Sequence, residues 1–107
     1  MALDPDKAYD ALIRAGEDWA DADAAASMLE ETRKSVLAKL MNEAPQTSMA
    51  GKEMLALADP QYSKFVEEMV NARKVANKKR VRYDSAKVLS ELRRSEESTR
   101  RAEMGMR

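Results

Sequence analysis

The stretch PQYSKFVEEMVNARKVANKKRVRYDSAKVLSELRRSEESTRRAEM, residues 60–104, decides the fold because it contains no glycine and no proline after its first residue. Asp59 and Pro60 form a helix-start signal, since aspartate caps free backbone N–H groups and proline suits the first helical position. The stretch therefore predicts one helix over residues 60–104, roughly 65 Å long at 1.5 Å per residue. So long a helix in a small chain needs a partner along most of its length.

The N-terminal part of the chain supplies that partner. Asp4 and Pro5 repeat the start signal, and helical spacing continues to Glu43, which predicts a helix over residues 4–43. The segment APQTS, residues 44–48, interrupts the pattern, and a short helix over residues 48–58 follows, with Ser48 or Thr47 as its cap. The sequence thus predicts a single all-α domain over residues 1–107, a long antiparallel, coiled-coil-like helical hairpin that we expect to form homo-oligomers.

Both long helices carry a heptad seam, because apolar residues recur in alternating steps of three and four. Each seam has one charged interruption, Arg33 in the first helix and Lys79 in the second long helix. The predicted seam of the first helix is Ala8, Leu12, Ala15, Trp19, Ala22, Ala26, Leu29, Arg33, Val36 and Leu40. That of the long C-terminal helix is Tyr62, Phe65, Met69, Ala72, Ala76, Lys79, Tyr83, Ala86 and Ser90.

Close packing favours a register in which large seam residues face small ones. This criterion predicts that Leu40 meets Phe65 and that Trp19 meets Ala86. A register about three residues shorter, with Trp19 on Tyr83 and Ala26 on Ala76, is the alternative.

Charge supports the same hairpin. Residues 72–101 contain eleven Lys or Arg and four Asp or Glu, whereas residues 1–31 contain nine acidic and two basic residues. Flanking charges of this kind select partner and orientation in coiled coils. The predicted ion pairs are Glu31 with Arg73, Glu17 with Lys87, and Asp10 with Arg94.

The remaining cations have no assigned acid. They are Lys74, Lys78, Lys79, Arg80 and Arg82, with Tyr83 among them. Cations with an interleaved aromatic ring can follow a nucleic-acid backbone while the ring stacks on a base. The ordinary alternative is a solvated helix face with Tyr83 packed in the seam, and the near-neutral pI of about 6.3 favours that alternative.

The segment KVANKKRVRY, residues 74–83, resembles the K-V-A-x-K-x-R-x-x-Y core of the UvsY family of phage recombination mediators. Its matching positions are Lys74, Val75, Ala76, Lys78, Arg80 and Tyr83. The resemblance implies a small helical protein that binds single-stranded DNA and helps to load a recombinase onto it.

Composition argues against most enzyme classes. The chain has no cysteine and no histidine, so the usual zinc sites and the usual general base are missing. The acidic cluster GEDWADAD, residues 16–23, has no matching carboxylate set on a facing helix, so we expect neither a metal site nor a cofactor. The N-terminus lacks the features of a signal peptide, and no run approaches the roughly 20 apolar residues of a membrane span. We therefore expect a cytoplasmic, non-enzymatic protein.

Two functions remain open. The leading hypothesis is a single-stranded nucleic-acid-binding accessory protein of phage-type recombination or replication, with a recombinase as a possible protein partner. The alternative is a coiled-coil module that docks on, or inhibits, a partner protein such as a host enzyme.

Overall fold

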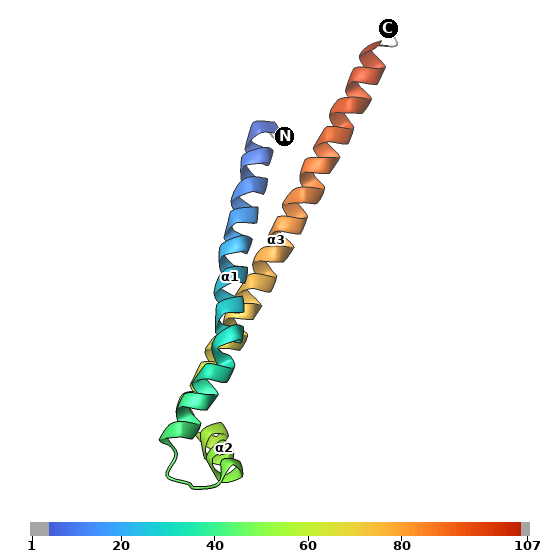
Figure 1. The fold of residues 1–107 in the computed structure, drawn as a ribbon. Helices are drawn as coiled ribbons and strands as arrows, with labels where there is room; N and C mark the ends of the chain where they lie inside the picture. Colours follow the sequence, from blue (N-terminus) through green and yellow to red (C-terminus); the bar gives the residue numbers. More distant parts are fainter. Residues whose placement is uncertain (1–4, 106–107) are drawn as a thin grey trace. The chain divides into compact units, whose positions relative to one another are not determined.

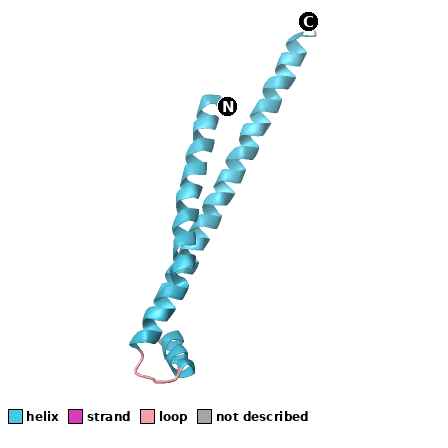
Figure 2. Cartoon of the chain, viewed as in Figure 1, coloured by secondary structure: helices cyan, strands magenta, loops and turns pink. Residues whose placement is uncertain are grey.

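The computed structural model describes residues 5–105 and consists of three helices (Figure 1). Helix α1 spans Pro5–Glu43, α2 spans Met49–Ala58 and α3 spans Pro60–Gly105. Figure 2 shows helices joined by a loop and a tight turn, and no strand occurs within residues 5–105. The predicted all-α helical hairpin is confirmed, with helix bounds within one residue of those expected. The predicted start at Asp4 lies outside the described residues.

Side-chain caps begin the second and third helices. The Ser48 hydroxyl accepts a hydrogen bond from the Gly51 backbone N–H at 3.1 Å, which fixes the start of α2. The Asp59 carboxylate accepts from the Gln61 backbone N–H at 2.8 Å and caps α3. These caps satisfy backbone N–H groups that the first turn of a helix leaves free, and so they fix where α2 and α3 begin.

The chain divides into two compact units, each containing a segment of α1 and a segment of α3. The first unit contains Met1–Asp21 and Asn77–Arg107, of which residues 5–21 and 77–105 are described. The second unit is Ala22–Ala76 and includes α2.

A small core closes the second unit. Leu40, Ala56 and Tyr62 are buried together, one from each helix, so that α2 covers the ends of α1 and α3 that it connects. Partly buried residues pack around them: Val36, Leu37, Met41 and Val66. Arg33, the charged interruption in the α1 seam, is exposed, but its Nε donates to the Tyr62 hydroxyl at 3.0 Å. The interruption is thus accommodated by a hydrogen bond at the edge of the core.

The seam positions are less exposed than the other faces of both helices. Every predicted seam residue of α3, including Phe65, Met69 and Tyr83, is buried or half-buried. The same holds for α1, including Leu12, Trp19, Leu29, Val36 and Leu40, with the single exception of Arg33.

The predicted register is wrong by about three residues. Leu40 packs with Tyr62 and not opposite Phe65, and the Trp19 ring lies on Tyr83 and not opposite Ala86. The shorter alternative is therefore correct.

The physical reason is that large residues share layers with large ones, and small residues with small ones. Ala26 and Ala76 are both completely buried. They lie at one level of the seam, because Arg73, one turn before Ala76, donates to Ser27, the neighbour of Ala26. Two helices can approach closely at an alanine layer and separate at an aromatic one, so the assumption that large seam residues face small ones was wrong.

Within residues 5–105 no helix combines the length and the apolar character needed to cross a membrane.

Candidate nucleic-acid interface

Arg73 is held within the second unit, as the sequence predicts, but by different partners. Its Nη1 donates to Asp23 Oδ1 at 2.6 Å, and its Nε donates to Glu30 Oε2 at 3.2 Å while Nη2 reaches Glu30 Oε1. A third contact runs from Nη2 to Ser27 Oγ at 3.2 Å. The hydrogen bonds from Arg73 hold the pKa of Glu30 below its usual range. Among the described residues the acids that Arg73 contacts are Asp23 and Glu30, so the predicted pairing with Glu31 is wrong.

The error follows from the position of the acids on α1. Asp10, Glu17 and Glu31 lie two residues away from a seam position on either side and therefore on the outer face of the helix. The positions that flank the seam on the side of Arg73 are Gly16, Asp23 and Glu30, which recur every seven residues. Acids at these positions lie on the side of α1 that meets Arg73, and Asp10, Glu17 and Glu31 do not.

Lys87 and Arg94 consequently remain exposed. Within the described residues no ion pair joins Lys87 to Glu17 or Arg94 to Asp10. Two cations that the sequence interpretation assigned to the hairpin are therefore available to solvent and to ligands.

The five cations of the predicted site have different environments. Lys74 and Lys78 are exposed, and neither forms an ion pair with another described residue. The Arg80 guanidinium carbon lies 5.9 Å from the centre of the Trp19 ring, and Arg80 Nε lies 4.0 Å from Asp84 Oδ2. Lys79 is half-buried in the seam, and Arg82 is exposed.

Tyr83 packs inside the first unit. Its ring centre is 5.3 Å from that of Trp19, with the planes inclined by 32°. Gly16 makes room for it, since a Cβ at that position would lie 3.3 Å from Tyr83 Cε2. Tyr83 thus lies half-buried at its seam position, with its ring against Trp19.

A small groove in the first unit brings cations of both long helices together. Lys79 and Arg82 of α3 line it with Arg14 of α1, and Asp18 is its only acidic lining residue. Ala11 and Ala15 complete the lining, and the groove has a volume of about 220 Å³. Short alanine side chains leave space that the longer cationic side chains surround.

Arg14 is the residue that the sequence interpretation missed. It belongs to a strongly acidic segment, so the charge count gave no reason to select it. Its position on the helix could have identified it as a groove residue. Arg14 precedes the seam residue Ala15 and lies one turn before Asp18, on the side of α1 that faces Arg82.

The groove has the chemistry of an anion site. Three cations and one carboxylate leave an excess of positive charge in a space large enough for a phosphate group. Arginine offers a planar fork that matches phosphate oxygens, and lysine adds a point charge on a flexible stem. Arg14 and Arg82 are exposed and can reorient towards a ligand, whereas Lys79 is anchored by its half-buried stem.

No group of three or more acidic residues within residues 5–105 is arranged to hold a metal ion. Comparison with protein-family models, with curated proteins and with solved structures finds no match to this chain.

Proposed function

We propose that this protein is a non-enzymatic accessory protein that binds single-stranded nucleic acid through its phosphate backbone. The observation that supports this function is the groove lined by Arg14, Lys79 and Arg82, in which two helices contribute cations around an alanine lining. Three further cations of the same unit, Lys78, Lys87 and Arg94, are exposed on α3 outside the groove.

The position of Tyr83 limits the mode of binding. Because this ring packs on Trp19, the proposed mode assigns no base stacking to Tyr83 and depends on phosphate charge. Binding is therefore independent of base sequence. A flexible single strand can direct one phosphate after another into a narrow groove, which a stiff duplex cannot do.

The test is the salt dependence of binding to a fluorescent oligodeoxythymidine, measured by anisotropy with the full chain. Neutralising about three phosphates gives a slope of roughly −2 in a plot of log K against log salt concentration. Absence of binding at about 50 mM salt, or binding without salt dependence, contradicts the proposal.

Arg14→Glu is the decisive variant, because it reverses one charge of the groove. It should weaken oligonucleotide binding by at least about tenfold and reduce the salt slope by about one. Lys34→Glu is its matched control, since Lys34 is an exposed cation of α1 in the other unit. Equal losses in the two variants would point to a general charge effect and not to the groove.

Helix α2 favours a second candidate function, docking on a partner protein. Its Met49 and Met54 side chains are 73% and 72% exposed, and Leu55 and Leu57 are exposed beside them. Flexible thioethers suit an adaptable protein contact. In the accessory role the partner would be a recombinase that acts on the same strand. If so, Met54→Glu should abolish pull-down of a purified recombinase and leave oligonucleotide binding unchanged; unchanged capture contradicts this candidate.

A further inference from the structure

The outer face of α3, opposite its seam, is uncharged over three heptads. The positions that recur there in steps of four and three are Val81, Ser85, Val88, Leu92, Ser95, Thr99 and Ala102. Charged residues make up 36% of the chain, so seven successive uncharged positions on one outer face are unexpected. We call this surface the outer face of α3.

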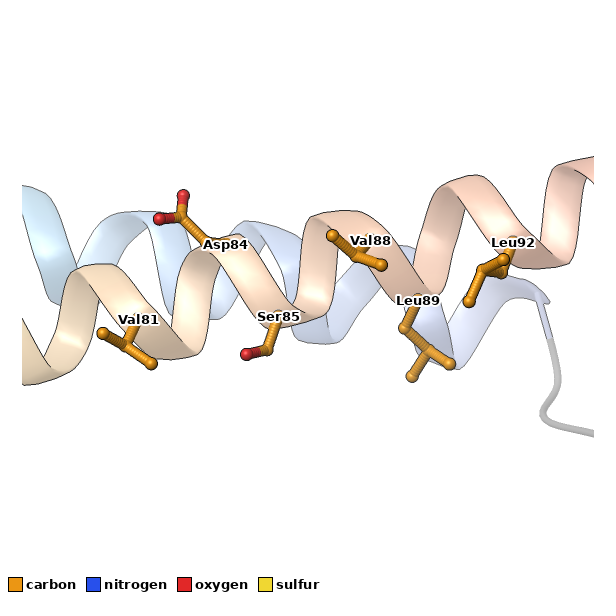
Figure 3. A pocket seen from close by; sticks show the side chains of 6 residues that line it. All are labelled: Val81, Asp84, Ser85, Val88, Leu89 and Leu92. Atoms are coloured by element: carbon orange, nitrogen blue, oxygen red, sulfur yellow. The ribbon is translucent and has the colours of Figure 1, made fainter.

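The apolar side chains of this face are exposed. Val81 is 63% exposed, Val88 55% and Leu92 56%. Figure 3 shows their side chains along α3, where together with Asp84, Ser85 and Leu89 they line a shallow hollow of about 480 Å³. A further hollow of about 360 Å³ continues past Leu92 along Ser95 and Thr99, and the charged side chains of Glu96, Arg100 and Glu103 form its border.

Helix formation does not explain these residues. Valine is a weaker helix former than alanine, lysine or glutamate, so exposed Val81 and Val88 do not stabilise α3 by propensity. Apolar residues at alternating steps of four and three are instead typical of a second helix-packing seam.

We propose that a second copy of this chain covers the outer face of α3, with the two α3 helices antiparallel. In a heptad arrangement centred near residue 90, Val88 of each copy packs against Leu92 of the other. Ser85 then meets Ser95, and Val81 meets Thr99. The small serine layer lets the helices approach between the larger layers.

Charge complementarity selects this orientation. In the antiparallel arrangement Arg82 of each copy flanks the seam beside Glu96 of the other, which within its own chain also accepts from Arg93 at 3.1 Å, and this contact occurs twice by symmetry. Leu89 lies beside its own counterpart near the axis, and Glu91 is the one like-charge contact. A parallel arrangement instead brings Glu91 beside Glu96 on both flanks, which is repulsive.

The length of the face sets the expected strength. In this register residues 81–99 of the two copies face one another over about 28 Å of helix. A surface of this size, with serine and threonine in several layers, is suited to a reversible dimer and not to an obligate one.

Sedimentation equilibrium of the full chain between about 5 and 200 µM tests the proposal, and we expect a monomer–dimer equilibrium. Val88→Glu should weaken dimerisation at least tenfold and leave helicity intact, because the side chain is exposed in the protomer. Val70→Glu is the matched control, since Val70 is also 55% exposed on α3 but lies before residues 81–102, in the second unit. A monomer throughout this range, or a Val88→Glu variant that dimerises like the unmodified chain, overturns the proposal.

Charge exchange and cross-linking test the orientation. Glu96→Arg and Arg82→Glu should each weaken the dimer, and their combination in one chain should restore it. Because the chain has no cysteine, a mixture of Val88→Cys and Leu92→Cys chains should form a disulfide-linked dimer on oxidation. Cross-linking of Val88→Cys chains alone would show a parallel pair and overturn the antiparallel register.

The dimer and the phosphate groove share Arg82, but one variant separates them. Glu96→Arg weakens dimerisation and leaves all groove residues in place. Loss of nucleic-acid binding in Arg14→Glu with an unchanged dimer, together with the reverse pattern in Glu96→Arg, identifies two distinct surfaces. Joint loss of both properties in either variant contradicts their separation.

Discussion

The two units of the chain contain segments of the same two long helices but differ in how many side chains those segments bury. In the second unit Leu40, Ala56 and Tyr62 form a closed core, and Arg73 is fully engaged by acids of α1. The first unit has the Trp19–Tyr83 ring pair at its seam and leaves several cations and the outer face of α3 exposed. The difference teaches that the buried core contacts are concentrated in the second unit, whereas α3 of the first unit leaves a long apolar line and several cations exposed.

The largest expected effect concerns the core of the second unit. Leu40→Ala should lower the free energy of unfolding by about 2 to 5 kcal/mol, because Leu40 is only 5% exposed and its loss leaves a cavity. Urea denaturation followed by circular dichroism measures the change. Leu92→Ala, at an exposed position of the first unit, is the control and should cost little at micromolar concentration. Equal costs would remove the distinction between the two units.

The next effect tests the close approach of the helices at the alanine layer. Ala26→Leu should destabilise the protein by about 1 to 3 kcal/mol, because both Ala26 and Ala76 have no exposed surface and a larger side chain must displace its neighbours. Ala25→Leu, at the adjacent exposed position, is the control for helix propensity. A neutral or stabilising Ala26→Leu would mean that the layer has free space.

The fold was largely predictable because its signals are local. Capping by Ser48 and Asp59, and the heptad spacing of each seam, depend on residues within a few turns of one another. The register was not predictable from these signals. It depends on which layers separate and which approach, and the deciding contacts join residues far apart in sequence, such as Arg73 with Asp23.

The candidate site was predictable only in part. Lys79 and Arg82 were selected for their basic surroundings, and both line the groove. Arg14 was not, since its local sequence is acidic and its importance comes from the helix opposite. Lys87 and Arg94 were misassigned because the acids chosen as their partners lie on the outer face of α1.

A smaller effect is expected for the ring pair of the first unit. A double-mutant cycle with Trp19→Leu and Tyr83→Leu should give a coupling energy of about 0.5 to 1.5 kcal/mol, because the ring centres are 5.3 Å apart. The matched cycle combines Trp19→Leu with Ala86→Gly, which the rejected register pairs, and should show little coupling. Stronger coupling to position 86 than to Tyr83 would restore that register.

The smallest effect is a pH dependence confined to the second unit. The pKa of Glu30 is lowered in the folded chain by hydrogen bonds from Arg73, so the unfolded chain binds more protons in the acid range. The stabilisation by this pair is complete above about pH 5 and is lost as the pH falls through the lowered pKa. Arg73→Met should therefore reduce the melting temperature at about pH 6 but much less at about pH 3.

Arg94→Met, which removes an exposed cation of the first unit, should give the same small change at both pH values. If Arg94→Met showed the stronger pH dependence, the first unit would hold the ion pair that matters for stability, and the contrast between the two units would be reversed.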